Sequence, residues 1–255
     1  MTREEVSALL DALERGEVRA AVRGEDGVWR ANAEVKEGIL EAFRLGVDVE
    51  SGAGALSFRD RDTLPPRREL PPGVRLVPGG TAVRRGAYLA KGVVVMPPAY
   101  VNVGAWVDEG SMVDSHALVG SCAQVGRRVH LSAAAQVGGV LEPVGAVPVV
   151  VEDEVFVGGG AGLYEGVCVG SRAVLAAGTV LTGTSVLFDL VREVEVRGAE
   201  GRPLVVPEGA VVVPGARPAA GGWAASRGLS LAAPVIVKYR DARTDARTAL
   251  EAALR

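Results

Sequence analysis

The chain has 255 residues and a formal net charge of −3, and 48% of its residues are hydrophobic but only 4% are aromatic. The small net charge argues against a nucleic-acid-binding surface, and no apolar run approaches the roughly 20 residues that a membrane span needs. Two cysteines, Cys122 and Cys168, are too few for a disulfide framework, and we interpret Cys122 as a buried, reduced thiol. The N-terminus is too acidic and too helical for a secretory signal, so we expect a soluble cytoplasmic protein.

Residues 1–73 are expected to form a small helical N-terminal domain and a linker. Thr2 and Glu5 have the spacing of a capping box, and an apolar face at positions 6, 9, 10 and 13 follows them. The pattern predicts a second helix from Ala33 to Leu45. Residues 47–73 are polar and contain clusters of Gly and Pro, so we interpret them as a linker.

From Val77 onward, a Val or Leu recurs at every sixth position, and the series is unbroken to Val137. It restarts at Val151 and continues to Leu181. A period of six fits neither an α-helix nor a simple amphipathic strand, but it is typical of a parallel β-helix in which three hexads make one coil. The residue four places after each anchor is mostly small, as a narrow interior requires. We therefore predict a mainly β fold, with a β-helix over residues 74–217.

Two segments interrupt the hexads. Residues 141–150 contain prolines and glycine, and they are predicted to leave the coil as a loop. Residues 186–205 break the period again and are interpreted as a hairpin excursion. Residues 218–255 form a C-terminal extension, with a last strand near 233–240 and a final helix from Thr244. Loops that protrude from a repeat scaffold often carry binding groups.

The stretch YVNVGAWVDEGSMVDSHALVGSCAQVG, followed by VHLS and GGVLEP, resembles the tetrahydrodipicolinate N-succinyltransferases. RLVP and AVRRGAYLA upstream, and PEGAVVVPG and PVIVKYRDA downstream, extend the resemblance over nearly the whole chain. It implies a left-handed β-helix and a homotrimer with active sites in the clefts between subunits. It also implies transfer of a succinyl group from succinyl-CoA to the amino group of ring-opened tetrahydrodipicolinate, in the diaminopimelate and lysine pathway. Coenzyme A would be a cosubstrate, with no bound cofactor and no metal, and neither nucleic acid nor membrane is an expected partner.

The resemblance assigns roles to single residues. Arg75 matches an arginine that binds a substrate carboxylate, a task that suits its fork of donors. Asp114 matches an aspartate at the substrate's amino end; the structural alternative is a corner carboxylate that accepts from backbone N–H groups. Gly139 matches a glycine whose N–H lies near the reacting carbonyl, where it could be an oxyanion donor or simply let the chain leave the coil. Gly139 and Gly158 are expected to bind the coenzyme.

Two departures from the family pattern leave the proton acceptor open. The segment GGGAGLYEGV stands where the common form of the family has GARSEVVEGV. Gly160 and Gly162 therefore occupy the positions of an arginine and a catalytic glutamate in that form. His116 stands in place of a tryptophan. The candidate bases are Asp114, which we favour, and His116 and Glu165. These departures keep two alternatives: an N-acetyltransferase acting on the same or a related amino dicarboxylate, and a non-catalytic trimeric hexapeptide-repeat protein.

Overall fold

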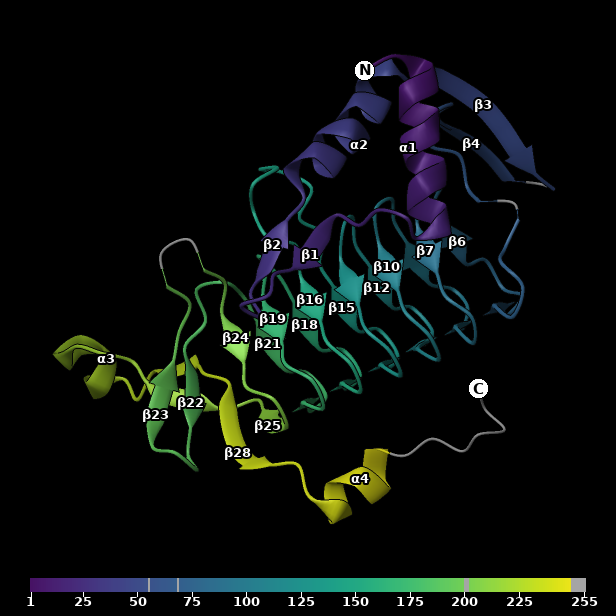
Figure 1. The fold of residues 1–255 in the computed structure, drawn as a ribbon. Coiled ribbons are helices and arrows are strands. Elements are labelled where there is room, and N and C mark those ends of the chain that lie inside the picture. Colours follow the sequence, from purple (N-terminus) through teal and green to yellow (C-terminus); the bar gives the residue numbers. More distant parts are fainter. Residues whose placement is uncertain (55, 68, 200–201, 249–255) are drawn as a thin grey trace.

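The computed structural model describes residues 1–54, 56–67, 69–199 and 202–248 (Figure 1). Its centre is a long prism of two-residue strands, with the N-terminal helices along one side and the C-terminal strands at one end. The prism has three faces, each a sheet of parallel strands, which we name sheets I, II and III. The expected fold class, a left-handed parallel β-helix with a small helical N-terminal domain, is confirmed.

Each face is a stack of strands taken from successive coils. Sheet I contains β7 (Tyr88–Leu89), β10 (Trp106–Val107), β13 (Gln124–Val125), β16 (Val150–Val151), β19 (Cys168–Val169) and β24 (Val205–Val206). The prism part of sheet II contains β5 (Arg75–Leu76), β8 (Val94–Val95), β11 (Met112–Val113), β14 (His130–Leu131), β17 (Phe156–Val157), β20 (Val174–Leu175) and β25 (Ala210–Val213). Sheet III contains β6 (Ala82–Val83), β9 (Tyr100–Val101), β12 (Leu118–Val119), β15 (Gln136–Val137), β18 (Gly162–Leu163) and β21 (Val180–Leu181).

The strand register follows the sequence period. Trp106 pairs with Tyr88 on one side and with Gln124 on the other, so uninterrupted neighbours are three hexads apart. The hexad anchors from Val83 to Leu181 are almost completely buried and fill the interior of the prism together with small residues such as Ala105 and Ala135. The third residue after most anchors adopts a positive φ, as His116 does at 62°. This conformation turns the chain at each corner.

The N-terminal domain packs against the prism through a second apolar cluster. Helix α1 (Arg3–Arg15) is preceded by the predicted capping box, and α2 (Ala33–Leu45) has Asn32 as its N-cap, whose side chain accepts from the Val35 N–H. Between them, β1 (Ala21–Arg23) and β2 (Trp29–Ala31) form an antiparallel ribbon beside sheet I (Figure 1). Cys122 belongs to this second cluster, so its buried thiol faces the helices from a corner of the prism.

The segment that we expected to be a linker is partly ordered as strands. Strands β3 (Asp48–Ala53) and β4 (Leu56–Arg61) pair over six positions as an antiparallel hairpin. The side chains of β4 are largely exposed, so no buried face gives this segment a hydrophobic alternation. Cross-strand hydrogen bonding, which residue type alone does not reveal, defines the hairpin.

The C-terminal part adds strands to the last coil of sheet II. Strands β22 (Leu187–Asp189) and β23 (Val194–Val196) form a hairpin, and β28 (Val235–Tyr239) lies between β22 and β25. Strands β26 (Ala216–Pro218) and β27 (Ser230–Ala232) flank the short helix α3 (Gly222–Ser226). Helix α4 is Ala242–Thr248, and the remainder of the helix expected from Thr244 lies outside the described residues. These additions cover one open edge of the coil, which would otherwise be an unpaired edge.

Candidate active site

Both excursions leave the prism at the corner between sheets III and I, and they enclose a cavity of about 790 Å³. The loop 141–148 separates β15 from β16, and the hairpin excursion separates β21 from β24. The cavity is lined by one outward residue of sheet III, by the loop, by the corner after β18 and by the base of the hairpin excursion. Its lining residues include Leu118, Gly138, Gly139, Val140, Glu142, Tyr164, Glu165, Gly183, Arg202 and Pro203. A concave site with few polar groups is the usual form of a ligand pocket.

Gly139 offers a backbone donor to this cavity. Its neighbours Gly138 and Val140 donate to the carbonyls of Leu163 and Ser121, but the Gly139 N–H donates to no group of the described residues. A Cβ atom at Gly139 would lie 2.6 Å from the Ser121 nitrogen, so the backbone of the preceding coil leaves room only for glycine. The structural alternative therefore applies, because the glycine permits close backbone packing, whereas the role of oxyanion donor stays a prediction.

A fully buried lysine holds the loop that forms one wall. The Lys36 ammonium on α2 donates to the carbonyl oxygens of Pro143 at 3.0 Å and Ala146 at 2.7 Å. Burial lowers the pKa of Lys36, and among the described residues no carboxylate pairs with it. The N-terminal domain is therefore bonded directly to the loop that lines the cavity.

Tyr164 occupies the space above Gly162. A Cβ atom at Gly162 would lie between 2.6 and 3.0 Å from the Cε2, Oη and Cζ atoms of the Tyr164 ring. Gly162 faces outward on β18, and the ring of Tyr164 covers it while remaining 38% exposed. At the position where the resemblance leads us to expect a carboxylate, the structure thus has a phenol that lines the cavity wall.

Glu165 lines the same cavity, so two of the sequence-predicted residues, Gly139 and Glu165, are brought together. Glu165 is exposed and has a φ of 55°, and its carboxylate lies close to the backbone of Gly183. Its side chain forms no hydrogen bond with any described residue. It therefore lies near the proposed oxyanion donor without being held in one orientation.

Asp114 and His116 lie at the other edge of sheet III, at the corner with sheet II, and do not line the cavity of their own chain. The Asp114 Oδ1 atom accepts from the Ser115 N–H at 2.7 Å. Asp108 and Asn102 make the same bond with the next residue at their own corners. The structural role considered for Asp114 is therefore present, and it leaves the second carboxylate oxygen available. His116 is exposed at the tip of its turn.

Arg75 and Gly158 belong to sheet II or its edge, outside the cavity. Arg75 pairs with Val94 on the first rung of sheet II, two rungs before Met112. Gly158 lies two rungs beyond Asp114 at the same corner, as the ladder of β11, β14 and β17 shows. A Cβ atom at Gly158 would lie 2.5 Å from the Ala177 nitrogen. Asp114 and Gly158 therefore share one corner, while Gly139 and Glu165 share the other.

Sequence reasoning missed Lys36, Tyr164 and Arg202. A signal for Lys36 was present, because it lies three residues before Ile39 on the apolar face of a predicted helix. The overlap of Tyr164 with Gly162 had no sequence signal, because the hexad pattern does not determine the direction of the Tyr164 ring at the corner after β18. Arg202 lies in an excursion whose path the hexads do not define.

In the described part of the chain, the two cysteines are unreactive and no cluster of metal ligands is present. Burial raises the pKa of the Cys122 thiol to about 12 and that of Cys168 to about 12, so both stay protonated and unreactive. The described residues contain no group of three His, Cys, Asp or Glu side chains placed to hold a metal ion. None of the helices described is long and apolar enough to cross a membrane.

Two family models match separate parts of the chain. Residues 1–45 match the tetrahydrodipicolinate N-succinyltransferase N-terminal model, and residues 148–183 match the hexapeptide repeat of succinyl-transferase. The 2,3,4,5-tetrahydropyridine-2,6-dicarboxylate N-succinyltransferase of Bradyrhizobium diazoefficiens is 44% identical, over 99% of this chain and 90% of its own length. The enzymes of the same name from Polynucleobacter asymbioticus and Nitrobacter hamburgensis are 42% and 43% identical over the same shares.

This chain belongs to the tetrahydrodipicolinate N-succinyltransferase family. The resemblance stated from the motifs is confirmed, and so is the classification as an acyltransferase. Members of this family use an acyl-CoA as cosubstrate. Roles for individual residues remain predictions.

Proposed function

We propose that this protein transfers the succinyl group of succinyl-CoA to the amino group of ring-opened tetrahydrodipicolinate, in the cytoplasm and as a homotrimer. The observation that carries the proposal is the Gly139 N–H in the wall of a cavity of about 790 Å³, which donates to none of the described residues. It belongs to a chain 44% identical to a named enzyme of this activity over nearly its full length. The fold contributes a scaffold, and the corner with its two excursions contributes the site.

The chemistry needs an amine, an oxyanion donor and a proton acceptor. In the proposed reaction, the amine nitrogen attacks the thioester carbonyl carbon, and the carbonyl oxygen gains negative charge. The Gly139 N–H then donates to that oxygen, an interaction that is stronger in the transition state than in the ground state. The C–S bond breaks, coenzyme A leaves as thiolate, and Asp114 accepts the amine proton.

Arg202 supports succinyl rather than acetyl as the acyl group. Among the described residues that line the cavity, it is the one cationic side chain. A succinyl donor carries a terminal carboxylate, which needs a cation in the cleft, whereas an acetyl donor does not. Substitution of Arg202 by leucine should therefore raise the KM for succinyl-CoA and leave the KM for acetyl-CoA nearly unchanged.

The homotrimer accounts for the division of the site between two corners. Asp114 does not line the cavity of its own chain, so a neighbouring subunit would supply it. The outward face of sheet III, which lies between the two corners, leaves Tyr100 37% and Val180 53% exposed, and subunit packing would cover them. Light scattering should give a mass three times that of the 26.3 kDa chain.

A free-thiol release assay with tetrahydrodipicolinate as acceptor tests the function directly. Purified protein is given succinyl-CoA and acetyl-CoA in parallel. Thiol release with succinyl-CoA alone supports the proposal. Release with acetyl-CoA alone would favour the acetyltransferase alternative, and release with neither would favour the non-catalytic one.

A further inference from the structure

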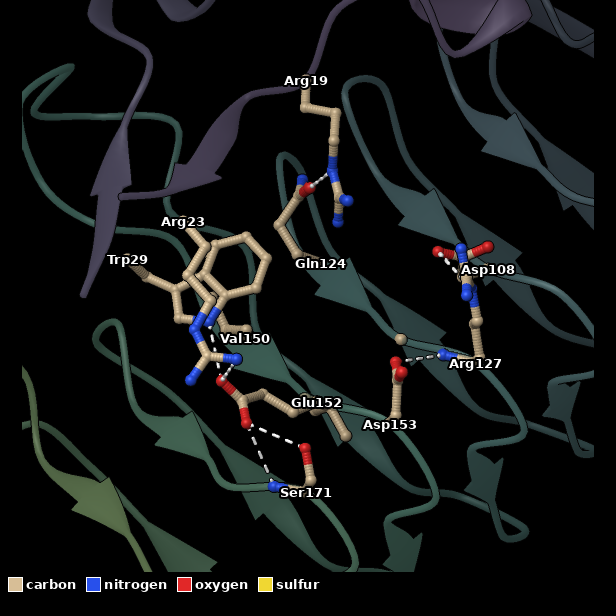
Figure 2. Close-up of a pocket in the computed structure, with 12 residues that line it drawn as sticks. Arg19, Arg23, Trp29, Asp108, Gln124, Arg127, Val150, Glu152, Asp153 and Ser171 are labelled. Carbon is tan, nitrogen blue, oxygen red and sulfur yellow. Dashed lines mark hydrogen bonds and ion pairs between the residues drawn. The ribbon is translucent and has the colours of Figure 1, made fainter. Parts of the chain in front are cut away.

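A second cavity, of about 250 Å³, lies between the β1–β2 ribbon and the outer face of sheet I (Figure 2). It is separate from the cavity at the corner of sheets III and I, and the two share no lining residue. Its walls come from three places: the segment around Arg19, the ribbon residues Arg23 and Trp29, and the outward residues and corners of β10, β13 and β16.

Arg19 presents a half-buried cation to this cavity. Its guanidinium lies 4.0 Å from the centre of the Trp106 ring and 5.5 Å from that of Trp29, and its Nε donates to the Gln124 Oε1 atom at 3.0 Å. Within the described part of the chain, no carboxylate pairs with it. Burial lowers the pKa of Arg19, and the charges of Asp108 and Asp153 across the cavity partly oppose that shift. The two terminal nitrogens of its guanidinium donate to no described residue, so a ligand carboxylate can accept from them.

Carboxylates face Arg19 from the other side of the opening in Figure 2. The Asp108 Oδ1 atom accepts from the Glu109 N–H at 2.8 Å, and its Oδ2 lies 3.9 Å from the Arg127 Nε. The Asp153 Oδ1 atom accepts from the Arg127 N–H at 2.8 Å. Each carboxylate therefore has one oxygen fixed by a backbone donor, and within the described residues no hydrogen bond reaches its second oxygen. A cationic group fits this side of the cavity.

Glu152 differs from these two aspartates, because both oxygens of its carboxylate already have partners. It accepts from the Trp29 Nε1 at 3.0 Å, and from the Ser171 N–H at 3.1 Å and hydroxyl at 3.0 Å, and it pairs with Arg23 at 3.4 Å. These bonds attach the ribbon to sheet I and fix the shape of the cavity. The open positions are therefore those of Arg19 on one side and of the two aspartates on the other.

We propose that this cavity binds a zwitterion the size of a free amino acid, with its carboxylate on Arg19, its ammonium group toward Asp108 and Asp153, and its side chain against Trp29. Three arginines and three acidic residues line the cavity, so its formal charge is balanced and a ligand of zero net charge suits it. The volume is below the range of about 300–1,000 Å³ that is usual for larger ligands.

Titration calorimetry and tryptophan fluorescence on the full-length protein test this proposal. Trp29 and Trp106 flank Arg19, so a Trp223→Phe background removes the signal of a distant, exposed tryptophan. The probes are L-methionine, L-glutamine and L-lysine, with butyrate and butylamine as analogues that carry only one of the two charges. At least one amino acid should bind, and both analogues should bind at least about tenfold more weakly, the loss expected for one charge-assisted contact.

Variants localise the binding. Arg19→Gln should weaken binding at least about tenfold. Arg15→Gln is the matched control, because Arg15 lies four residues earlier, is exposed and pairs with Glu17 outside the cavity; it should bind as the parent does. If Arg19→Gln does not fold, Asp108→Asn replaces it and should show the same loss. The proposal is overturned if no amino acid binds up to about 10 mM, if butyrate binds as tightly as the amino acids, or if a folded cavity variant keeps full affinity.

Discussion

Replacing Lys36 with methionine is expected to release the loop 141–148 from helix α2. Methionine keeps most of the length and apolar volume of lysine, but it cannot donate to the carbonyls of Pro143 and Ala146. Two hydrogen bonds from a charged donor contribute roughly 1.5–3 kcal/mol each. Removal of a buried ammonium returns several kcal/mol of desolvation, by the usual order of magnitude. The two effects largely offset each other in the global free energy of unfolding. The amides of the loop should therefore lose protection from hydrogen exchange while the fold persists.

Amide hydrogen exchange over residues 141–148 measures this directly, and steady-state kinetics measures its effect on the site. Exchange in the loop should rise, and the KM for the acyl donor should increase about tenfold, equivalent to about 1.4 kcal/mol. Lys91→Met is the matched control, because Lys91 is exposed in a turn of the prism. Unchanged exchange and unchanged KM in Lys36→Met would show that the two carbonyl contacts do not hold the loop.

The same lysine gives a signed pH prediction. Burial makes the pKa of Lys36 lower in the folded protein than in the unfolded chain. Between the lowered folded pKa and the unfolded value of about 10.4, the unfolded chain binds more protons, so the free energy of unfolding rises with pH. Urea titrations at a series of pH values that approach the unfolded pKa of about 10.4 from below should show this rise in the parent relative to Lys36→Met. A constant difference between the two proteins would contradict it.

Three further substitutions test the candidate site. Asp114→Asn keeps an oxygen acceptor for the Ser115 N–H, as Asn102 does at its own corner. We therefore expect an unchanged melting temperature, with turnover reduced at least about 10²-fold. Near-normal turnover would show that Asp114 is not the base. Arg75→Ala should mainly raise the KM for the dicarboxylate acceptor, and an unchanged KM would make Arg75 structural. Gly162→Ala should displace the Tyr164 ring, because the added Cβ lies 2.6 Å from it. Gly162→Ala should lower the free energy of unfolding by at most about 1–3 kcal/mol. In a double-mutant cycle, the same substitution made in a Tyr164→Val background should cause no such loss. If the two substitutions are fully additive, the ring does not occupy this space.

The hexad period by itself determined the scaffold. An anchor at every sixth position enters one continuous core when the chain turns three times per coil, and the observed registers have this spacing. The same period predicted where the chain leaves the prism, because Gly and Pro interrupt it before β16. Local capping chemistry likewise determined where α1 begins, since Thr2 and Glu5 act over three residues.

The tertiary structure alone decided which functional groups meet. Gly139 and Glu165 line one cavity because the coil stacks their corners, whereas Asp114 lies at the opposite edge of sheet III although it is closer in sequence to Gly139. Lys36 reaches the loop only because α2 packs over the prism, more than 100 positions away along the chain. Hydrophobic periodicity reports the buried side of each strand, which is a local property. Contacts between outward residues and excursions depend on how coils, loops and the N-terminal domain pack together, and no repeat in the sequence encodes that packing.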